Sequence, residues 1–271
     1  MKRLSIYAII VLIGIGSTLA RAQQVNTLYF LENAPMRHII NPAFQPVSNV
    51  YITLPAIGYT SLWAGNNAFT MKDFIFTDAN GNTITPFHPN ANPNWLQRKP
   101  KNTLVDVDAY INLFGLGVRV KENGYFHLNI SEHIFASASM GTNLFGINQL
   151  DSGMIGPFAL GANAMVYTDI ALGYSHKIND QWTVGGKFKF LVGQAYLGAG
   201  IDELSLATST EMLHAYGNGH IAVAAPLQWQ NLPTDINNLD ELNTEDLIST
   251  DYRNWLTPAG LGAAFDLGAT Y

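Results

Sequence analysis

The stretch Tyr125–Met140, YFHLNISEHIFASASM, alternates between two kinds of side chain. Its even positions are mostly apolar, as at Phe126 and Leu128, whereas its odd positions carry mostly polar or small side chains, as at His127 and Asn129. Side chains that alternate with period two point to opposite faces of a β-strand. This stretch is therefore predicted to be a strand with one apolar and one polar face.

Similar alternation recurs in long segments elsewhere, namely Phe158–Tyr174, Trp182–Val192 and Ala259–Tyr271. Strands in globular proteins usually have about five or six residues, whereas a strand that crosses a membrane needs ~9–11. The length of these segments predicts an all-β fold, an antiparallel transmembrane β-barrel of the outer-membrane type. A secreted β-sandwich is the alternative, and it would be expected to have shorter strands and more charge on its exposed face.

The amino-acid composition also favours a transmembrane β-barrel. Only 13% of the 271 residues are charged, against about 25% in an average soluble domain, yet no internal window supplies the ~20 apolar residues that a membrane helix needs. Transmembrane barrels combine these properties, because alternation dilutes their apolar residues. The chain also has no cysteine, which excludes disulfides, thiolate metal sites and a lipid-anchored cysteine.

Residues 1–22 are predicted to be a secretory signal peptide. Two basic residues precede a short apolar run that two glycines interrupt, and Ala20 and Ala22 form a small-x-small cleavage site before Gln23. A membrane anchor helix is the alternative, but the apolar run is short for that role. We therefore expect an exported protein located in the cell outer membrane.

The remaining chain is expected to contain an N-terminal periplasmic or plug-like segment, residues 23–49, followed by barrel strands in residues 50–271. Long loops are predicted at 64–102, 141–156 and 228–257, and tight turns at Val120–Tyr125, Lys177–Trp182 and Tyr216–His220. Outer-membrane barrels alternate short periplasmic turns with long external loops. If the turns share one side, strands are expected at roughly 50–60, 104–120, 125–140, 157–177, 182–197, 205–216, 219–226 and 259–271. The abrupt end of the last strand predicts the N-terminal part of a larger barrel rather than a complete small one.

The N-terminal segment contains a proline-rich motif, NPAFQP, formed by Asn41, Pro42, Ala43, Phe44, Gln45 and Pro46. Proline disfavours helix interiors and central strands, and it holds the preceding residue in an extended conformation. We expect a structured periplasmic segment that docks on, or inside, the mouth of the barrel. An ordinary linker is the alternative.

Aromatic residues cluster at the ends of the alternating segments. In transmembrane barrels such residues form girdles at the lipid headgroups. Five are predicted to lie at the membrane interface: Tyr125, Phe126, Phe158, Tyr174 and Trp182.

Patterns for catalysis, cofactors or metals are weak. The glycine-rich stretches 115–120 and 198–203 lack the third glycine and the following helix of a dinucleotide site. His127 and His133 are six residues apart on one predicted strand face, which favours polar lumen residues over metal ligands. The acidic stretch 232–256 lacks the central glycine of a calcium loop. The sequence predicts no enzymatic activity, no cofactor, no metal site and no nucleic-acid binding.

Three stretches resemble an uncharacterised family of Bacteroidota outer-membrane β-barrels, a domain of unknown function. They are LYFLENAPMRHIINPAFQP at 28–46, NDQWTVGGKFKFLVGQA at 179–195 and PAGLGAAFDLGATY at 258–271. The NPA element is also similar, more distantly, to the start of barrels associated with type IX secretion and gliding. The resemblance implies a barrel with further strands, and it implies no catalytic residues.

The predicted function is therefore that of a structural or secretion-associated barrel in contact with outer-membrane lipid. It would bind protein partners through its extracellular loops or its periplasmic N-terminus. The alternative is a passive transporter or channel for a hydrophobic or small polar solute, with the N-terminal segment in the lumen.

Overall fold

The computed structural model describes residues 26–31, 33–55, 58–70, 73, 75–77, 81–85, 99–142, 144, 153–208, 213–225 and 258–271. The predicted cleavage residues Ala20, Ala22 and Gln23 lie outside the described residues, as does the predicted loop at 228–257. Among the described residues, no helix combines the length and the hydropathy needed to cross a bilayer.

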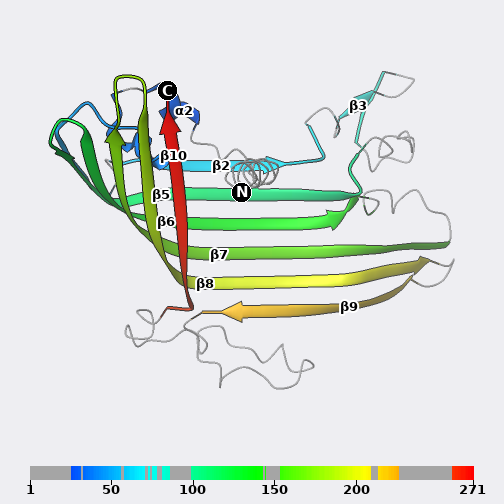
Figure 1. The fold of residues 1–271 in the computed structure, drawn as a ribbon. Helices are drawn as coiled ribbons and strands as arrows, with labels where there is room; N and C mark the ends of the chain where they lie inside the picture. The colour runs from blue at the N-terminus through cyan, green and yellow to red at the C-terminus, as the bar shows by residue number, and fades with distance from the viewer. Residues whose placement is uncertain are drawn as a thin grey trace, which may run out of the picture.

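The described chain is almost entirely antiparallel β, which confirms the predicted fold class. An eight-stranded sheet has the order β1-β5-β6-β7-β8-β10, with β2 also paired to β5 and β9 also paired to β8 (Figure 1). The described strands do not close into a cylinder. The elements are α2 (Asn26–Phe30), η1 (Pro35–Ile39), β1 (Val50–Thr53), β2 (Thr60–Asn66), β3 (Phe76–Thr77), β4 (Thr83–Ile84), β5 (Asn102–Val120), β6 (Gly124–Gly141), β7 (Gly153–Lys177), β8 (Thr183–Thr208), β9 (Leu213–Ala224) and β10 (Gly260–Thr270).

The two edges of the sheet are interrupted strands. β1 pairs with residues 115–118 of β5, and β2 continues along the same edge, opposite residues 105–111. On the other side, β9 pairs with the second part of β8 and β10 with its first part, residues 183–193. The chain therefore runs up and down through neighbouring strands, as outer-membrane barrels do.

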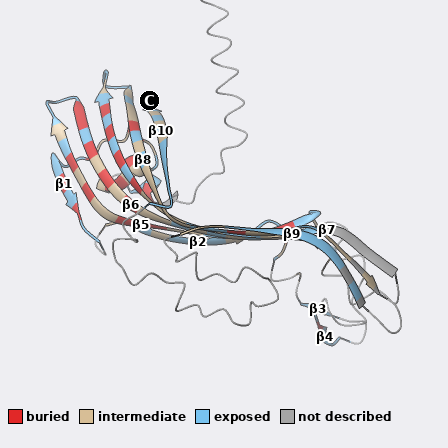
Figure 2. Cartoon of the chain, turned by 90° about the horizontal axis from the view of Figure 1, so that it is seen from below, coloured by how far each residue is buried: buried red, intermediate tan, exposed pale blue. Residues whose placement is uncertain are grey.

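The sheet bends where both edges are interrupted. The β5–β6 register shifts between Asn112 and Phe114, and the β7–β8 register shifts between Val166 and Tyr167, which leaves Gln194 unpaired with β7. Such β-bulges bend a strand and increase its twist. Figure 2 shows the strands turning sharply along this line. We call the part that contains β1 and β10 the turn-side half, and the part that contains β2 and β9 the far half.

Two of the predicted tight turns are present, and both lie at the end of the turn-side half. Residues 121–123 join β5 to β6, and residues 178–182 join β7 to β8. Lys121, the first residue of the β5–β6 turn, occupies the left-handed region with φ of 57°.

The third predicted turn, Tyr216–His220, is wrong, because these residues lie inside β9. The two strands predicted at 182–197 and 205–216 are correspondingly replaced by the continuous strand β8 and by the start of β9. A Cβ at Gly217 would lie 2.7 Å from the carbonyl oxygen of Glu203, so glycine here allows close approach to β8 rather than a turn. The predicted long loop at 64–102 contains the end of β2 and the small β3–β4 hairpin.

The two faces of the sheet differ in an unusual way. We call the face that carries His127 and Asn129 the inner face, and the face that carries Phe126 and Leu128 the outer face. The strand register places buried polar residues on the inner face: Asn112, His127, Asn129, Ser131, Asp169, Ser175 and Lys187. It places exposed apolar residues on the outer face: Phe126, Ile170, Leu172, Phe188, Phe190, Phe265 and Leu267.

Candidate functional site: the N-terminal segment on the inner face

The N-terminal segment packs against the inner face of the turn-side half. Its 3-10 helix η1 starts with Pro35, a residue suited to the first helical position, and presents His38 to the sheet. The His38 side chain is 1% exposed. Its Nε2 lies 2.6 Å from the Tyr51 hydroxyl, and its ring stacks on that of His127 with centroids 4.2 Å apart. This helix is thus held by two strands distant in sequence.

Burial lowers the pKa of His38 well below its usual 6.5, and the neighbouring His127 and Lys187 lower it further. His38 is therefore neutral at physiological pH while it is docked. A neutral imidazole can be buried beside an ammonium group at much lower cost than a charged one.

The Asn41-Pro42 pair reaches the last strand of the sheet. The Asn41 side-chain amide donates to the carbonyl of Ala269 in β10 at 3.1 Å, and its Oδ1 accepts from the Ala43 amide at 2.9 Å. The backbone approaches closely here, since a methyl group added at Gly185 would overlap the Pro42 carbonyl. The first two residues of the NPAFQP motif therefore fit only against a strand that lacks side chains at these points.

The end of the motif is held by Arg119 on β5. Its guanidinium donates to the carbonyl of Pro46 at 2.5 Å, to Oε1 of Gln45 at 3.2 Å and to Oδ1 of Asn49 at 3.1 Å. Gln45 in turn donates to the carbonyl of Asn123, in the tight turn, at 3.0 Å. The motif thus spans the turn-side half from the β5–β6 connection to β10.

Phe44 lies in the motif between Asn41, which contacts β10, and Pro46, which contacts Arg119. Its ring accepts the guanidinium of Arg37 at 4.2 Å from the ring centroid, and it packs edge-on against Tyr29. Ala43, Pro42 and Pro46 are buried. The motif is therefore part of the packed inner layer.

An ion-pair cluster in contact with the N-terminal segment joins β8 to β10. Lys187 and Lys189 lie 3.0 and 2.9 Å from the same Asp266 oxygen. The buried Lys187 ammonium also donates to the His38 carbonyl at 3.4 Å. One buried cation therefore links the N-terminal segment to the final strand.

A second hydrogen-bond network connects five polar side chains nearer the bend. Thr53 donates to Asn112 at 2.8 Å, and Asn112 donates to Asn129 at 2.6 Å. Asn129 then donates to the Tyr110 hydroxyl at 2.9 Å, which lies 2.6 Å from the hydroxyl of Ser131. Fully connected polar networks of this kind stabilise a buried polar layer.

The aromatic residues predicted at a membrane interface differ in exposure and in the face of the sheet on which they lie. Phe126, Tyr174 and Trp182 are 36%, 45% and 44% exposed, the first two on the outer face and Trp182 beside a turn. Tyr125 is 1% exposed, faces inward and stacks on Tyr51. Adjacent strand residues point to opposite faces, so Tyr125 and Phe126 cannot both face outward. The backbone of Phe158 pairs with Leu204, and its side chain is outside the described set.

His127 and His133 lie on the inner face as expected, in different surroundings. His127 contacts the N-terminal segment, whereas His133 pairs with Asp169 at 3.2 Å at the bend. Within the part of the chain that the structure describes, no group of three or more side chains suits a metal ion. The contacts of Arg119 and Lys187 with the N-terminal segment were not predicted from the sequence; for Arg119 the available signal was a single basic residue in the low-charge strand β5.

A family model described as a family of unknown function, DUF5723, matches residues 42–271. The match begins at Pro42, within the motif that contacts β10. No curated protein and no solved structure matches the chain.

Proposed function

The chain belongs to the DUF5723 family of unknown function, and we propose that it is an exported outer-membrane β-barrel protein whose own N-terminal segment fills the inner face at its turn end. The observation that carries this proposal is the reversal of polarity between the faces. Water-soluble sheets bury apolar residues and expose polar ones, whereas this sheet buries asparagine, serine and lysine and exposes leucine and phenylalanine. A bilayer is the solvent that suits such an outer face.

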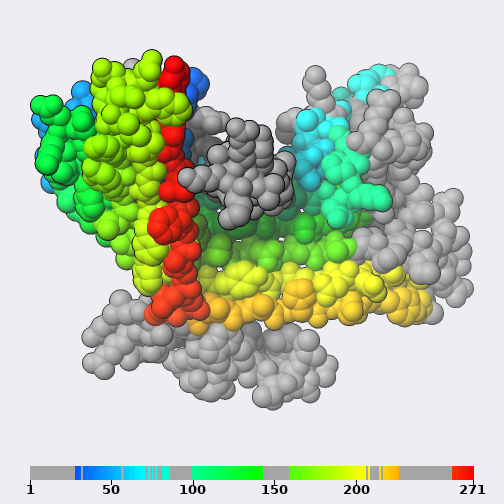
Figure 3. All heavy atoms as spheres, viewed as in Figure 1, coloured from blue at the N-terminus to red at the C-terminus, as the bar shows by residue number. Residues whose placement is uncertain are grey.

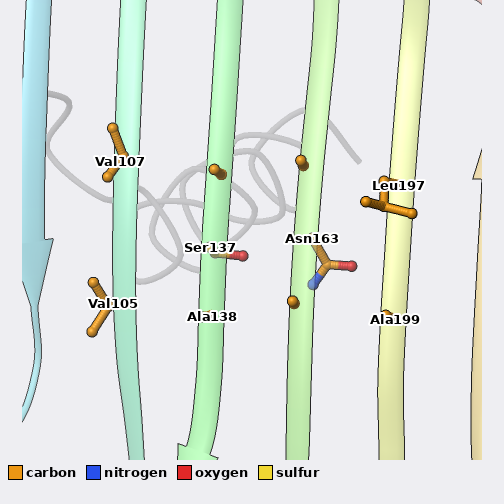
Figure 4. A pocket seen from close by; sticks show the side chains of 10 residues that line it. Val105, Val107, Ser137, Ala138, Asn163, Leu197 and Ala199 are labelled. Atoms are coloured by element: carbon orange, nitrogen blue, oxygen red, sulfur yellow. The ribbon is translucent and has the colours of Figure 1, made fainter. Parts of the chain in front are cut away.

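The outer face stays apolar past the bend. In the far half, alanines on β6, β7 and β8 form a shallow groove that Val105 and Val107 border on one side and Leu197 on the other (Figure 4). Strands β5 and β6 have 19 and 18 residues, which is longer than the ~9–11 residues that a crossing requires. An apolar surface on strands of this length supports a membrane-spanning role.

The barrel is proposed to be structural or secretion-associated, without enzymatic activity, and to bind protein partners. The fixed position of residues 36–46 supports this, because a segment held by Arg119, Lys187 and Asn41 obstructs passage at the turn end. The resemblance to barrels of Bacteroidota and to secretion-associated barrels agrees with this role.

A single-cysteine experiment tests membrane insertion, since the chain has no cysteine of its own. Leu172→Cys places a thiol on the exposed outer face, and Asp180→Cys places one in the tight turn. Each variant is labelled with bimane in proteoliposomes. We expect blue-shifted emission that brominated lipid quenches at position 172 but not at position 180. If the bimane emission at both positions were that of a probe in water, the proposal would be contradicted.

A passive transporter is the second candidate. The inner face of the far half favours it, because half-buried side chains such as Trp63, Asp106, Asp108 and His133 line that face outside the contacts of the described N-terminal segment. Single-channel conductance of the full chain, compared with a variant in which Arg119→Ala and Asn41→Ala release the motif, separates the two candidates. A pore that opens only in the variant would favour the transporter.

A further inference from the structure

Charge is distributed unequally along the sheet. The described strand segments of the far half, residues 60–66, 102–112, 132–141, 153–166, 194–208 and 213–224, contain no lysine or arginine. On the inner face they carry the carboxylates of Asp106 and Asp108, and Asp169 follows at the bend, where it pairs with Ser131 and Leu191. The turn-side half instead carries Arg119, Lys187 and Lys189. The inner face of the far half is therefore acidic, with no lysine or arginine on its own strand segments; Lys187, in the turn-side half, interacts electrostatically with Asp169.

The three carboxylates belong to one cluster with aromatic rings. Asp108 interacts electrostatically with Asp106 and His133, and both Asp108 and Asp169 interact with Tyr167. The rings of His133 and Tyr167 stack at a centroid distance of 4.6 Å with an interplanar angle of 4°. Tyr110 meets the edge of His133 at 5.0 Å. Aromatic faces and carboxylates are thus presented together.

Two further rings lie flat on this face. Trp63 is directly opposite Asp108 in the β2–β5 pair, and its ring covers Gly65, where an added Cβ would overlap it. Tyr196 covers Gly198 in the same way and donates to Asn163 at 3.1 Å. Rings that lie flat over glycine expose their π faces, the surface that attracts a cation.

One buried carboxylate oxygen in the cluster lacks a partner. Asp169 is 4% exposed, and its Oδ2 pairs with His133, while no hydrogen-bond partner reaches its Oδ1 among the described residues. A buried, unpaired carboxylate oxygen is costly. A donor or a cation from a ligand would satisfy it.

We propose that the inner face around Asp108 is a binding site for a small organic cation, with Asp108 and Asp106 as the anionic groups beside the ligand, Asp169 behind His133 as a further anionic group, and Trp63 and Tyr167 as the ring surfaces. The described side chains do not form a metal-binding group, and the carboxylates disfavour anions. Aromatic faces add attraction for an ammonium group that a hydrated metal ion would not exploit in the same way. The concave side of the bent sheet is seen between β10 and β2 in Figure 3.

This inference rests on the proposed function to the extent that the inner face is the lumen of a barrel. Choline serves as the probe, and 3,3-dimethylbutan-1-ol, its uncharged isostere, serves as the shape control. Binding to the full chain is measured by ligand-observed NMR in a non-ionic polyoxyethylene detergent, since phosphocholine detergents would compete. We expect choline to bind with upfield-shifted methyl protons, and the alcohol to bind at least tenfold more weakly.

Asp108→Asn is expected to weaken choline binding at least tenfold, and Trp63→Leu to weaken it several-fold with loss of the upfield shift. The matched control is Glu132→Gln, which removes a carboxylate near the same level of the sheet from the outer face. This control should bind choline as the unaltered chain does. Equal binding of choline and the alcohol, no binding of choline, or an equal loss in Glu132→Gln would each overturn the cation site. The bimane experiment is independent of these outcomes, so failure of the site and failure of the membrane proposal are distinguishable.

Discussion

The imidazole of His38, in the N-terminal segment, stacks on the imidazole of His127, in β6, with centroids 4.2 Å apart and an interplanar angle of 14°. The ammonium group of Lys187 lies against the same segment, 3.4 Å from the His38 carbonyl oxygen. This arrangement requires His38 to be neutral, so docking of the N-terminal segment is coupled to proton binding.

We expect docking of the segment to weaken as the pH falls below 6.5. Undocked His38 titrates near 6.5, whereas docking holds its pKa well below that value. The undocked state therefore binds more protons below pH 6.5, at a cost to docking of up to about 1.4 kcal/mol per pH unit. A spin label on Val47→Cys, an exposed position, should become more mobile in acid. His38→Gln should reduce this pH dependence, with the remainder coming from His127, which stacks on His38; an unchanged profile in that variant would refute the coupling.

Lys187→Met should reduce the same pH dependence. The positive charge of Lys187 contributes to the lowered pKa of His38, so its removal lets that pKa rise toward 6.5 and narrows the pH window in which docking is lost. The spin-label mobility at position 47 again provides the measurement. Lys189→Met is the control, because Lys189 shares Asp266 but is not among the groups that lower the pKa of His38. Identical profiles for the two variants would count against this explanation.

Gly185→Ala should displace the motif, whereas Gly186→Ala should not. A methyl group at Gly185 overlaps the backbone of Pro42, which cannot rotate away, while one at Gly186 meets its nearest atom, on the Leu267 side chain, at 3.5 Å. Overpacking of this kind costs roughly 1–3 kcal/mol. The urea midpoint and the rate of proteolysis within residues 34–49 measure the effect. Equal behaviour of the two neighbouring variants would show that the close approach does not exist.

Arg119→Lys should loosen the end of the motif although it keeps the charge. Arginine holds Pro46, Gln45 and Asn49 together through its planar guanidinium, and a single ammonium group cannot reach all three. We expect a loss of about 1.5–3 kcal/mol in docking, as for one hydrogen bond to a charged group. Proteolysis near Gln45 should quicken in this variant. Lys121→Arg, at the exposed turn, should leave the rate unchanged.

Local signals explain most of what could be predicted. The period-two pattern of Tyr125–Met140 and the turn residues of Val120–Tyr125 act over short stretches of chain, so strand β6 and its turn were recognisable. The glycines of 216–220 misled the prediction because glycine serves both turns and closely packed strands. Only the pairing with β8 distinguishes these two uses.

The contacts of the NPAFQP motif, by contrast, could not be predicted from local signals. Asn41 meets Ala269 across 228 positions of sequence, and Arg119 meets Pro46 across 73. No local preference encodes such pairs. They arise once the bulges at Asn112 and Gln194 bend the sheet around the segment.

The sequence by itself determined that the chain forms long antiparallel strands with one polar and one apolar face, because a strand's side chains alternate whatever surrounds them. Only the tertiary structure decided that the polar face is the buried one in the turn-side half. It also decided that Tyr125 faces inward while Phe126 faces outward, and that the NPAFQP motif rests on Gly185 and Arg119. The physical reason is that burial depends on the partner brought to each face, and here that partner is the chain's own distant N-terminal segment.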